Sequence, residues 1–432
     1  MSVEVRCWAG LPTAHHERID WSGSPASLPE TAGSLLPRGA GRSYGDVCLN
    51  PGGSLIDTRW TDRYVAFDPE TGVLRCESGL RLGTLLAHLR PLGWTLPVVP
   101  GTRWVTVGGA LANDVHGKNH RHAGSFGHHV RAIHLLRSDG SLDRLAPGED
   151  RFTATIGGLG LTGLVTEVAL QLRRRSGMWL QEHASHARGL DRVLSELDTA
   201  SAQHEYAAVW LDMTQPDPER LFGLLLAADP IEGGGDASGF ARPARIGVGR
   251  LPRLPLVGRL STRVFNAVYR RLAARHPGSR RVDERSCLFT LDSIGDWNRL
   301  YGSSGLRQYQ CVLPLGTAPG GMEALCRVLS DSRVTCSLAV LKRFGDQRPA
   351  GMLSFPREGF TLAMDFPNDE ERLLVLFRRL DAIVLEAGGA VYPAKDAHMS
   401  RELFRAAFTR TDEFAAHVDP RFSSGFWRRV GA

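Results

Sequence analysis

The residues best suited to chemistry are concentrated in positions 100–130, PGTRWVTVGGALANDVHGKNHRHAGSFGHHV. A Gly-Gly pair in this run is followed by a short Ala/Leu segment and then by histidine, lysine and asparagine side chains. Glycine lets the backbone approach a ligand closely, and the first turn of a helix carries a partial positive charge. Together these features are typical of a turn that binds phosphate. We therefore expect a strand at Trp104–Val107, a turn at Gly108–Gly109 and a helix beginning at Ala110.

A second glycine-rich loop, LPRGAGRSYGD, spans residues 36–46. Its glycines alternate with Arg38, Arg42 and Ser43. Open backbone N–H groups beside arginine and serine donors favour the binding of a pyrophosphate. A plain surface turn is the alternative interpretation.

A third glycine motif, GLGLTG at residues 158–163, matches the pattern GxGxxG. In a dinucleotide-binding Rossmann fold this motif opens a helix. Here it precedes LVTEVALQL, which is rich in β-branched residues and alternates like a strand. A Rossmann fold is therefore disfavoured, and we expect the glycines to let a loop lie against a flat ligand.

Five histidines between residues 116 and 129 raise the alternative of a metal site, since HxxxH and HxH spacings occur. Glycines interrupt any helix that would align them, and no paired carboxylates are near in sequence. We expect no metal. The histidines are His116, His120, His122, His128 and His129.

The overall composition predicts a globular protein of two domains, or one large discontinuous domain, for 432 residues. The net charge of +6 favours anionic partners. Seven scattered cysteines without a CxxC pair favour a reducing compartment over a disulfide framework or zinc site. Because no apolar run reaches 18 residues and the first residues lack the apolar core of a signal peptide, we expect a cytoplasmic protein, with membrane contact only at the surface.

The elements that must position these loops fall into two groups. Up to residue 175, one amphipathic helix is expected at Leu82–Leu89, and strands at Ser54–Asp57, Tyr64–Phe67, Val73–Glu77, Val130–Leu136, Leu142–Leu145 and Leu164–Leu172. Beyond it, helices and strands that alternate predict an antiparallel sheet covered by helices on one face. The helices are expected near Leu190–Leu197, Met322–Leu329 and Asp369–Ala387, and the strands at Tyr206–Met213, Leu221–Ala227, Leu306–Leu313, Leu338–Phe344 and Phe360–Phe366.

An insert at residues 231–285 interrupts this second group. It contains twelve arginines between Arg242 and Arg285, interspersed with apolar residues and prolines. Such a basic amphipathic stretch predicts a membrane-surface element or a lid over an anionic substrate. A mobile solvated loop is the alternative. Binding of nucleic acid is not expected, because no known reader motif accompanies the charge.

The glycine-rich runs carry a family resemblance. RGAGRSYGD, PGTRWVTVGGALANDVHGKNHRHAGSFG and TIGGLGLTGLV resemble the FAD-binding domain of the vanillyl-alcohol-oxidase/p-cresol-methylhydroxylase (PCMH) superfamily. WNRLYGSSGLRQYQ, VLKRFG, LSFP, MDFP and YPAKD extend the resemblance over nearly the whole chain, to the decaprenylphosphoryl-β-D-ribose 2′-oxidase family.

The resemblance implies an α+β, two-domain flavoprotein. Residues 1–175 would form the PCMH-type FAD-binding domain, residues 176–390 the antiparallel-sheet substrate-binding domain, and residues 391–432 a segment that returns to the FAD domain. Some superfamily members bind FAD covalently through a histidine in the first glycine loop. Arg42 stands at that position here, so noncovalent FAD is implied.

The implied reaction oxidises the 2′-hydroxyl of a polyprenylphosphoryl-β-D-ribose to the 2′-keto sugar. This is the first half of the epimerisation that makes the arabinose donor for cell-wall arabinan, and a separate keto-reductase would take the product. The implied location is peripheral, at the inner membrane. An aldonolactone or alditol oxidase, another FAD-dependent alcohol dehydrogenase and a non-enzymatic flavin-binding protein stay open as alternatives. The arginine-rich insert favours a lipid-phosphate substrate.

The resemblance also assigns roles to residues. Lys395 corresponds to an essential lysine beside the flavin, where a cation stabilises negative charge on the reduced ring. His116 or Tyr301 is expected near the reacting hydroxyl, and Lys342 near that hydroxyl or the phosphate. Lys118 is expected to order the site, while Gln308 and Gln310 bind the sugar; the catalytic base stays open. The residues implied to contact FAD are Arg38, Gly39, Ala40, Gly41, Arg42, Ser43, Tyr44, Gly101, Thr102, Val105, Thr106, Gly108, Gly109, Asn113, His116, Gly117, Asn119, Ser125, Gly158, Gly160, Gly163 and Lys395.

One position departs from the family pattern. Well-known members carry a cysteine two residues before the Asp-Phe-Pro run, and this chain has Ala363 there. Hydride transfer does not need that thiol, so the resemblance still implies activity. Inhibitors that trap the thiol covalently are not expected to act on this protein.

Overall fold

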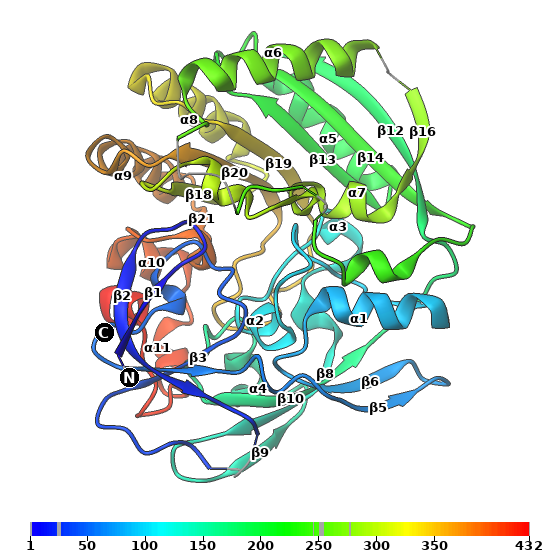
Figure 1. The fold of residues 1–432 in the computed structure, drawn as a ribbon. Helices are drawn as coiled ribbons and strands as arrows, with labels where there is room; N and C mark the ends of the chain where they lie inside the picture. The colour runs from blue at the N-terminus through cyan, green and yellow to red at the C-terminus, as the bar shows by residue number, and fades with distance from the viewer. Residues whose placement is uncertain (1, 24–26, 245, 250–254, 276–277, 432) are drawn as a thin grey trace.

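The computed structural model describes residues 2–23, 27–244, 246–249, 255–275 and 278–431 (Figure 1). Its elements form two units. The lower unit in Figure 1 contains residues up to about 175 together with the C-terminal helices, and the upper unit is built on one large antiparallel sheet. The predicted α+β class with an antiparallel sheet in the second half is confirmed.

Two sheets form the lower unit. The first has the order β1-β2-β4-β3 and is mixed, because β4 runs parallel to both of its neighbours. The second, β5-β6-β10-β8-β9, is antiparallel throughout. The strands are β1 (Ser2–Arg6), β2 (Thr13–Asp20), β3 (Leu35–Arg38), β4 (Ser54–Asp57), β5 (Tyr64–Asp68), β6 (Val73–Glu77), β8 (Val130–Leu136), β9 (Leu142–Leu145) and β10 (Leu164–Gln171), with a small pair, β7 (Trp94–Thr95) and β11 (Arg173–Arg174), beside them.

Short helices cover the second sheet. The leucines of α1 (Leu82–Leu89) are buried in one apolar cluster with Leu74 of β6 and Val168 of β10. Their helical spacing gave the predicted bounds, which are confirmed, as is a strand after Gly163. The remaining helices of this unit's N-terminal part are α2 (Val107–Ala112), α3 (His120–Ala123), α4 (Asp150–Thr155) and the 3-10 turns η1 (Asp46–Cys48), η2 (Arg90–Leu92) and η3 (Phe126–His129).

The strand predicted at Trp104–Val107 is wrong. These residues form a turn, and α2 begins at Val107 rather than Ala110. Thr106 caps the helix, since its Oγ1 accepts a hydrogen bond from the Gly109 N–H. A side-chain cap of this kind fixes a helix start more strongly than the β-branched run favours a strand.

The upper unit is an eight-stranded sheet of order β16-β12-β14-β13-β19-β20-β18-β21. Every pairing in it is antiparallel. The strands are β12 (Trp179–Arg188), β13 (Tyr206–Asp212), β14 (Phe222–Ile231), β16 (Gly278–Asp283), β18 (Leu306–Leu313), β19 (Leu338–Phe344), β20 (Gly359–Pro367) and β21 (Ala390–Val391).

Helices lie on both faces of this sheet, not on one as predicted. Val209 and Leu211 of β13 share a core with α5 (Leu190–Gln203), α8 (Ala318–Ser332) and α9 (Glu370–Glu386). The alternate residue Trp210 packs instead against Tyr269 of α6 (Arg259–Arg275), at 4.9 Å between ring centroids. The insert at 231–285 thus contains a long helix on the opposite face. The other short elements of the unit are η4 (Ala237–Phe240), β15 (Ile246–Gly247), α7 (Glu284–Leu288), η5 (Thr290–Ser293), β17 (Ile294–Gly295) and η6 (Trp297–Leu300).

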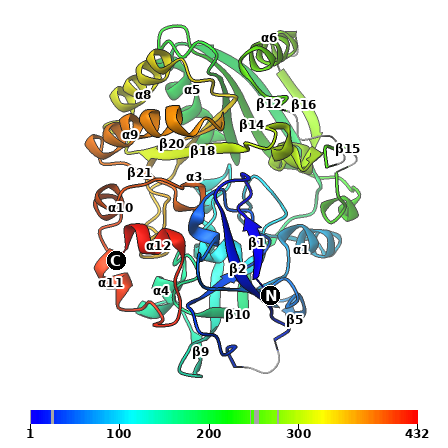
Figure 2. The same cartoon turned by 60° about the vertical axis from the view of Figure 1, so that its left-hand side comes forward.

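The C-terminal segment returns to the lower unit, where Figure 2 shows its helices beside β1 and β2. Arg429 forms ion pairs with Asp46, 2.9 Å away, and with the buried Asp396. Tyr44 donates its backbone N–H to the Ala394 carbonyl at 2.8 Å. The segment comprises η7 (Pro393–Lys395), α10 (Arg401–Ala407), α11 (Thr411–Ala415) and α12 (Gly425–Val430), and it brings Lys395 to the first glycine loop.

Changing Gly45 to alanine is expected to loosen this contact. A Cβ at Gly45 would overlap the carbonyl oxygen of Asp396, a clash between two backbones that no rotamer change relieves. Overpacking of this kind costs about 3 kcal/mol or more, so we expect a lower melting temperature and a lower FAD content in the purified protein. Gly316→Ala is the matched control, because a Cβ there meets nothing within 4 Å. Equal melting temperatures for the two variants would contradict the observed packing.

Candidate active site

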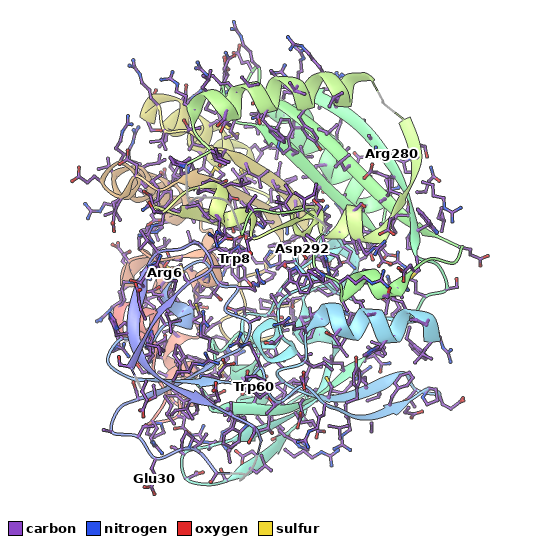
Figure 3. The ribbon with its side chains drawn as sticks, in the orientation of Figure 1. Arg6, Trp8, Glu30, Trp60, Arg280 and Asp292 are labelled. Carbon is purple, nitrogen blue, oxygen red and sulfur yellow. The ribbon has the colours of Figure 1, made fainter. Side chains whose placement is uncertain are left out.

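A cavity lies between the two units. Trp8 and Asp292, both labelled in Figure 3, mark the junction, where Asp292 accepts hydrogen bonds from the backbone and side chain of Arg103. Lining residues come from the first glycine loop, the 100–116 turn, the GxGxxG loop, three strands of the large sheet and the C-terminal segment. Those predicted from sequence are Arg38, Gly39, Ala40, Gly41, Arg42, Ser43, Tyr44, Gly101, Thr102, Val105, Thr106, Gly108, Gly109, Asn113, His116, Gly160, Gly163, Gln308, Gln310, Lys342 and Lys395.

The first glycine loop presents its backbone to the cavity. Backbone N–H groups at residues 39–43 donate no hydrogen bond within the described chain. Gly39 packs so closely on Thr106 that a Cβ would overlap its Oγ1, and Gly41 has a positive φ of 61°. Arg42 lies 3.9 Å above the ring of Trp8. The loop is therefore a row of open donors between two arginines, which suits a pyrophosphate.

The Gly108–Gly109 pair does not supply open donors, contrary to the sequence expectation. The N–H groups of Val107 and Gly108 donate to the carbonyls of Leu80 and Ser78, and that of Gly109 is taken by Thr106. Gly108 is needed for packing, since a Cβ there would lie 3.0 Å from the Cβ of Ser78. Gly108 thus lets α2 approach Ser78, which directly follows β6, and both glycines of the pair line the cavity.

Alternate residues along the strands of the large sheet line the polar end of the cavity. On β18 the lining residues are Gln308 and Gln310, and on β20 they are Ala363 and Asp365. Their register partners on β19 face the same way, because Val340 pairs with Ala363. Since successive strand residues point to opposite faces, one face of three strands forms this wall.

His116 is held in one orientation by a hydrogen-bond chain. Thr361 donates to the Cys311 carbonyl, so its oxygen accepts from the amide of Gln310, whose other N–H points to His116 Nε2 at 3.0 Å. With Nε2 accepting, a neutral His116 carries its proton on Nδ1. Burial, and then the positive charge of Lys342, hold the pKa of His116 well below its usual range.

Two partly buried lysines and one buried carboxylate complete the polar end of the cavity. Burial, and then the positive charge of Lys118, lower the pKa of Lys342 to about 7. Burial also lowers the pKa of Lys395 to about 7, although Asp365 acts in the opposite direction. Lys395 Nζ lies 3.5 Å from the centroid of the Tyr44 ring. Asp365 has a pKa raised to about 6 by burial, and it accepts a hydrogen bond from Gln308.

Buried polar atoms without partners collect around the cavity. In folded proteins such atoms nearly always have a partner. Here the side-chain atoms that lack one within the described chain and line this single cavity are Arg38 Nε, Arg42 Nε, Asn113 Oδ1, His116 Nδ1, Gln308 Oε1 and Asp365 Oδ2. This concentration indicates a ligand with many polar atoms.

Four predicted FAD contacts lie outside the lining and support the turn behind it. Asn119 donates to the Pro97 carbonyl at 2.9 Å, and Ser125 donates to Asp114 at 2.8 Å. A Cβ at Gly158 would overlap the Ala154 carbonyl, so that glycine permits a close turn. Gly117 is similarly packed against Asn119 and the Val99 carbonyl.

Lys118 and Tyr301 also lie outside the lining. Lys118 Nζ donates to the Cys287 carbonyl and acts on the cavity only through its charge beside Lys342. The hydroxyl of Tyr301 forms a hydrogen bond with Ser337 at 2.8 Å. The other histidines of residues 116–129 form hydrogen bonds with backbone groups. His120 Nδ1, for example, accepts from the Gly345 N–H at 3.1 Å.

Sequence reasoning did not single out Asp365 as a functional residue. It lies in the MDFP run that contributed to the resemblance, and a single charged residue in a mostly apolar strand was a usable signal. The aromatic lining residues Trp8, Trp297 and Tyr392 were missed as well. They come from three distant parts of the chain, so no local pattern joins them.

Comparison with known proteins identifies the family. A family model described as an FAD binding domain matches residues 28–146. The chain is 33% identical over 413 residues to decaprenylphosphoryl-β-D-ribose oxidase of Mycolicibacterium smegmatis, covering 92% of this chain and 89% of that protein. The chain belongs to this oxidase family. The recognition made from the glycine loops is therefore confirmed, and the protein is an FAD-dependent oxidoreductase of the class that acts on alcohol groups.

Two further relatives show how much of the chain the likeness covers. An uncharacterised protein of Streptomyces coelicolor is 33% identical over 82% of this chain and its own full length. An alditol oxidase of a Streptomyces species is 28% identical, but the match covers only 40% of this chain and 42% of that enzyme. Likeness to the oxidase family thus extends through the large sheet, whereas likeness to the alditol oxidase does not extend over the whole chain.

The cavity of this family member fits FAD. Open N–H groups at residues 39–43, with Arg38 and Arg42, would hold the pyrophosphate. Lys395, the unpaired amide atoms and Asp365 would meet the polar edge of the flavin ring and the substrate beside it. Among the described residues, no helix has the length and apolar character needed to cross a bilayer.

Proposed function

We propose that this oxidase acts on the 2′-hydroxyl of a polyprenylphosphoryl-β-D-ribose and produces the 2′-keto sugar. The observation that carries the proposal is Lys342, which lines the cavity wall, is partly buried, and forms no ion pair or hydrogen bond within the described chain. Its ammonium group lies 5.9 Å from the centroid of the Phe344 ring. Partial removal of a cation from water is costly when no anion balances its charge. An anionic substrate group would supply the missing partner, as the phosphate of a lipid-linked sugar does.

Bound FAD supplies the acceptor for the hydride that leaves the sugar carbon. The chain's own residues orient that carbon and stabilise charge. Gln308 and Gln310 offer amide atoms to the sugar hydroxyls, and the remaining wall, including Leu338, Val340 and Ala363, is apolar. Lys395 in its protonated form stabilises negative charge that develops on the ring.

Asp365 is the proton acceptor that the geometry favours. His116 has its Nε2 engaged by Gln310 and its proton on Nδ1, so it is a donor toward the cavity. Asp365 keeps one carboxylate oxygen free and is ionised above about pH 6. A base whose pKa lies near the working pH is efficient at removing a hydroxyl proton.

We propose that FAD is held without a covalent bond. Arg42 stands where some superfamily members carry the linking histidine, and His116 is the only histidine in the described lining. Denaturing the protein with acid is expected to release all flavin into the supernatant. Flavin that precipitates with the polypeptide would contradict this binding mode.

The substrate proposal is tested by anaerobic mixing of the holoenzyme with farnesylphosphoryl-β-D-ribose, followed by the flavin absorbance. Bleaching by this compound, but not by free ribose or alditols, supports the lipid-phosphate substrate. Bleaching by alditols alone would identify an alditol-type oxidase instead. A keto product on a lipid-linked sugar then requires a separate reductase to complete the epimerisation toward an arabinose donor for the cell wall.

A further inference from the structure

The helix α6 turns most of its apolar side chains to solvent and its polar side chains to the sheet. Five apolar side chains at helical spacing point to solvent, with exposed fractions of 75% for Leu260, 57% for Val264, 61% for Phe265, 48% for Val268 and 49% for Leu272. A helix on the surface of a globular protein normally buries such a stripe. Exposing it is unfavourable unless a partner covers it.

Apart from Tyr269, which packs on Trp210, the face of α6 that meets the sheet is polar. Asn266 donates to Asp212 at 2.9 Å, and Arg270 donates to the same carboxylate at 3.0 Å. Thr262 is buried beside them. These bonds to β13 anchor the helix by its polar side, so its orientation is fixed and the apolar stripe cannot rotate inward.

Positive charge borders the exposed stripe. Arg259, Arg263 and Arg271 precede Leu260, Val264 and Leu272 by one residue each, and all three are exposed. They form no ion pair with any described residue, and α6 contains no acidic residue. Apolar side chains flanked by arginines match an anionic lipid surface. The apolar side chains insert among the acyl chains, and the arginines bind the headgroups.

We propose that α6 is a membrane-binding helix that lies in the plane of an anionic bilayer and inserts its apolar stripe among the lipids. A second copy of the chain is the less suitable occupant, because two such faces would bring their unpaired arginines together. The proposal rests on the helix itself and holds whatever sugar the enzyme oxidises.

The helix lies on the cavity side of the large sheet. Trp210, under α6, pairs with Val340, which lines the cavity, and paired residues share a face. The segment that enters α6 is also tied to the cavity wall. The N–H groups of Leu256 and Val257 both donate to the Leu300 carbonyl, in the same short turn as the lining residue Trp297. Figure 1 shows α6 at the outer edge of the upper unit, so a bilayer bound by α6 would lie on the same face of the large sheet as the cavity wall.

Flotation of the full-length holoenzyme with vesicles tests this inference without any substrate. One set of vesicles is phosphatidylcholine alone, and the other contains equal parts of phosphatidylcholine and phosphatidylglycerol. We expect binding to the anionic vesicles that weakens with added salt. Each change of Arg263 or Arg271 to glutamine is expected to weaken binding about fivefold. The triple variant V264S/F265S/V268S is expected to remain unbound.

A matched triple variant controls for the loss of apolar surface. Trp60, Leu142 and Val375 are similarly exposed and lie on other elements, so W60S/L142S/V375S is expected to bind vesicles like the unmodified enzyme. Flavin reduction by a soluble short-chain substrate in detergent should be equal in both variants, which separates membrane binding from the reaction. Unmodified enzyme that stays unbound with both vesicle types overturns the inference. A dimer in solution that only V264S/F265S/V268S converts to monomer would assign the face to a second copy instead.

Discussion

Replacing Lys395 with methionine is expected to slow substrate-driven reduction of the flavin by about 10³-fold, as loss of a preorganised charge in a closed site typically does. The lysine is partly buried at the meeting point of the first glycine loop, β20 and the C-terminal segment. Methionine preserves much of the side-chain length, so FAD should stay bound. Stopped-flow reduction under anaerobic conditions gives the rate, and the flavin-to-protein absorbance ratio gives the occupancy.

Lys118→Met is the matched control for this prediction. Lys118 lies outside the cavity lining and donates to a backbone carbonyl. Its removal should change the rate far less than removal of Lys395. A rate for Lys395→Met within about threefold of the unmodified enzyme would exclude charge stabilisation by Lys395, since such a factor is under 1 kcal/mol.

The charge of Lys395 also predicts a pH dependence. With a pKa of about 7, the free enzyme loses this proton as pH rises through neutrality, so a rate that needs the protonated form falls on the alkaline side. Asp365 raises the pKa of Lys395. Changing Asp365 to asparagine should therefore move the alkaline limb to lower pH, in addition to removing the proposed base.

Much of the fold was predictable because the strands and helices follow simple periodicities. The bounds of β6, β18 and β19 agree with those expected from alternation. The resemblance located Lys395, which no periodicity would have placed, since its position depends on a tail that returns to the first glycine loop.

The site itself was less predictable, for physical reasons. The glycine-rich stretches 39–41 and 108–109 look alike in sequence. The first leaves its backbone N–H groups open to the cavity, whereas the second donates its N–H groups to Ser78 and Thr106. Whether such N–H groups stay open depends on which part of the backbone packs against the glycines, and this packing cannot be read from the sequence. The orientation of α6 was hidden for the same reason, because only the position of Asp212 shows that its polar face is the buried one.

Replacing Lys342 with methionine is expected to weaken substrate use and strengthen the fold at the same time. Loss of a charged partner for the phosphate costs about 1.5–3 kcal/mol, so kcat/KM for farnesylphosphoryl-β-D-ribose should fall by about 10- to 100-fold. The fold should gain, because the variant no longer holds a partly buried ammonium group without an ion-pair partner, and apolar replacements of such charges with similar volume are often stabilising.

The pH dependence of stability distinguishes this account from a merely damaged site. The pKa of Lys342 is about 7 in the folded protein and near 10.5 when exposed. Between these values the unfolded state binds more protons, so the stability of the unmodified apo-protein should rise as pH increases from 7 toward 10. Lys342→Met should be more stable at pH 7 and show a smaller rise. Denaturant unfolding of both apo-proteins at pH 7 and pH 9 measures this difference. A variant less stable than the unmodified protein at pH 7 would mean that Lys342 has a partner in the fold, and the anionic substrate group would no longer be needed to explain it.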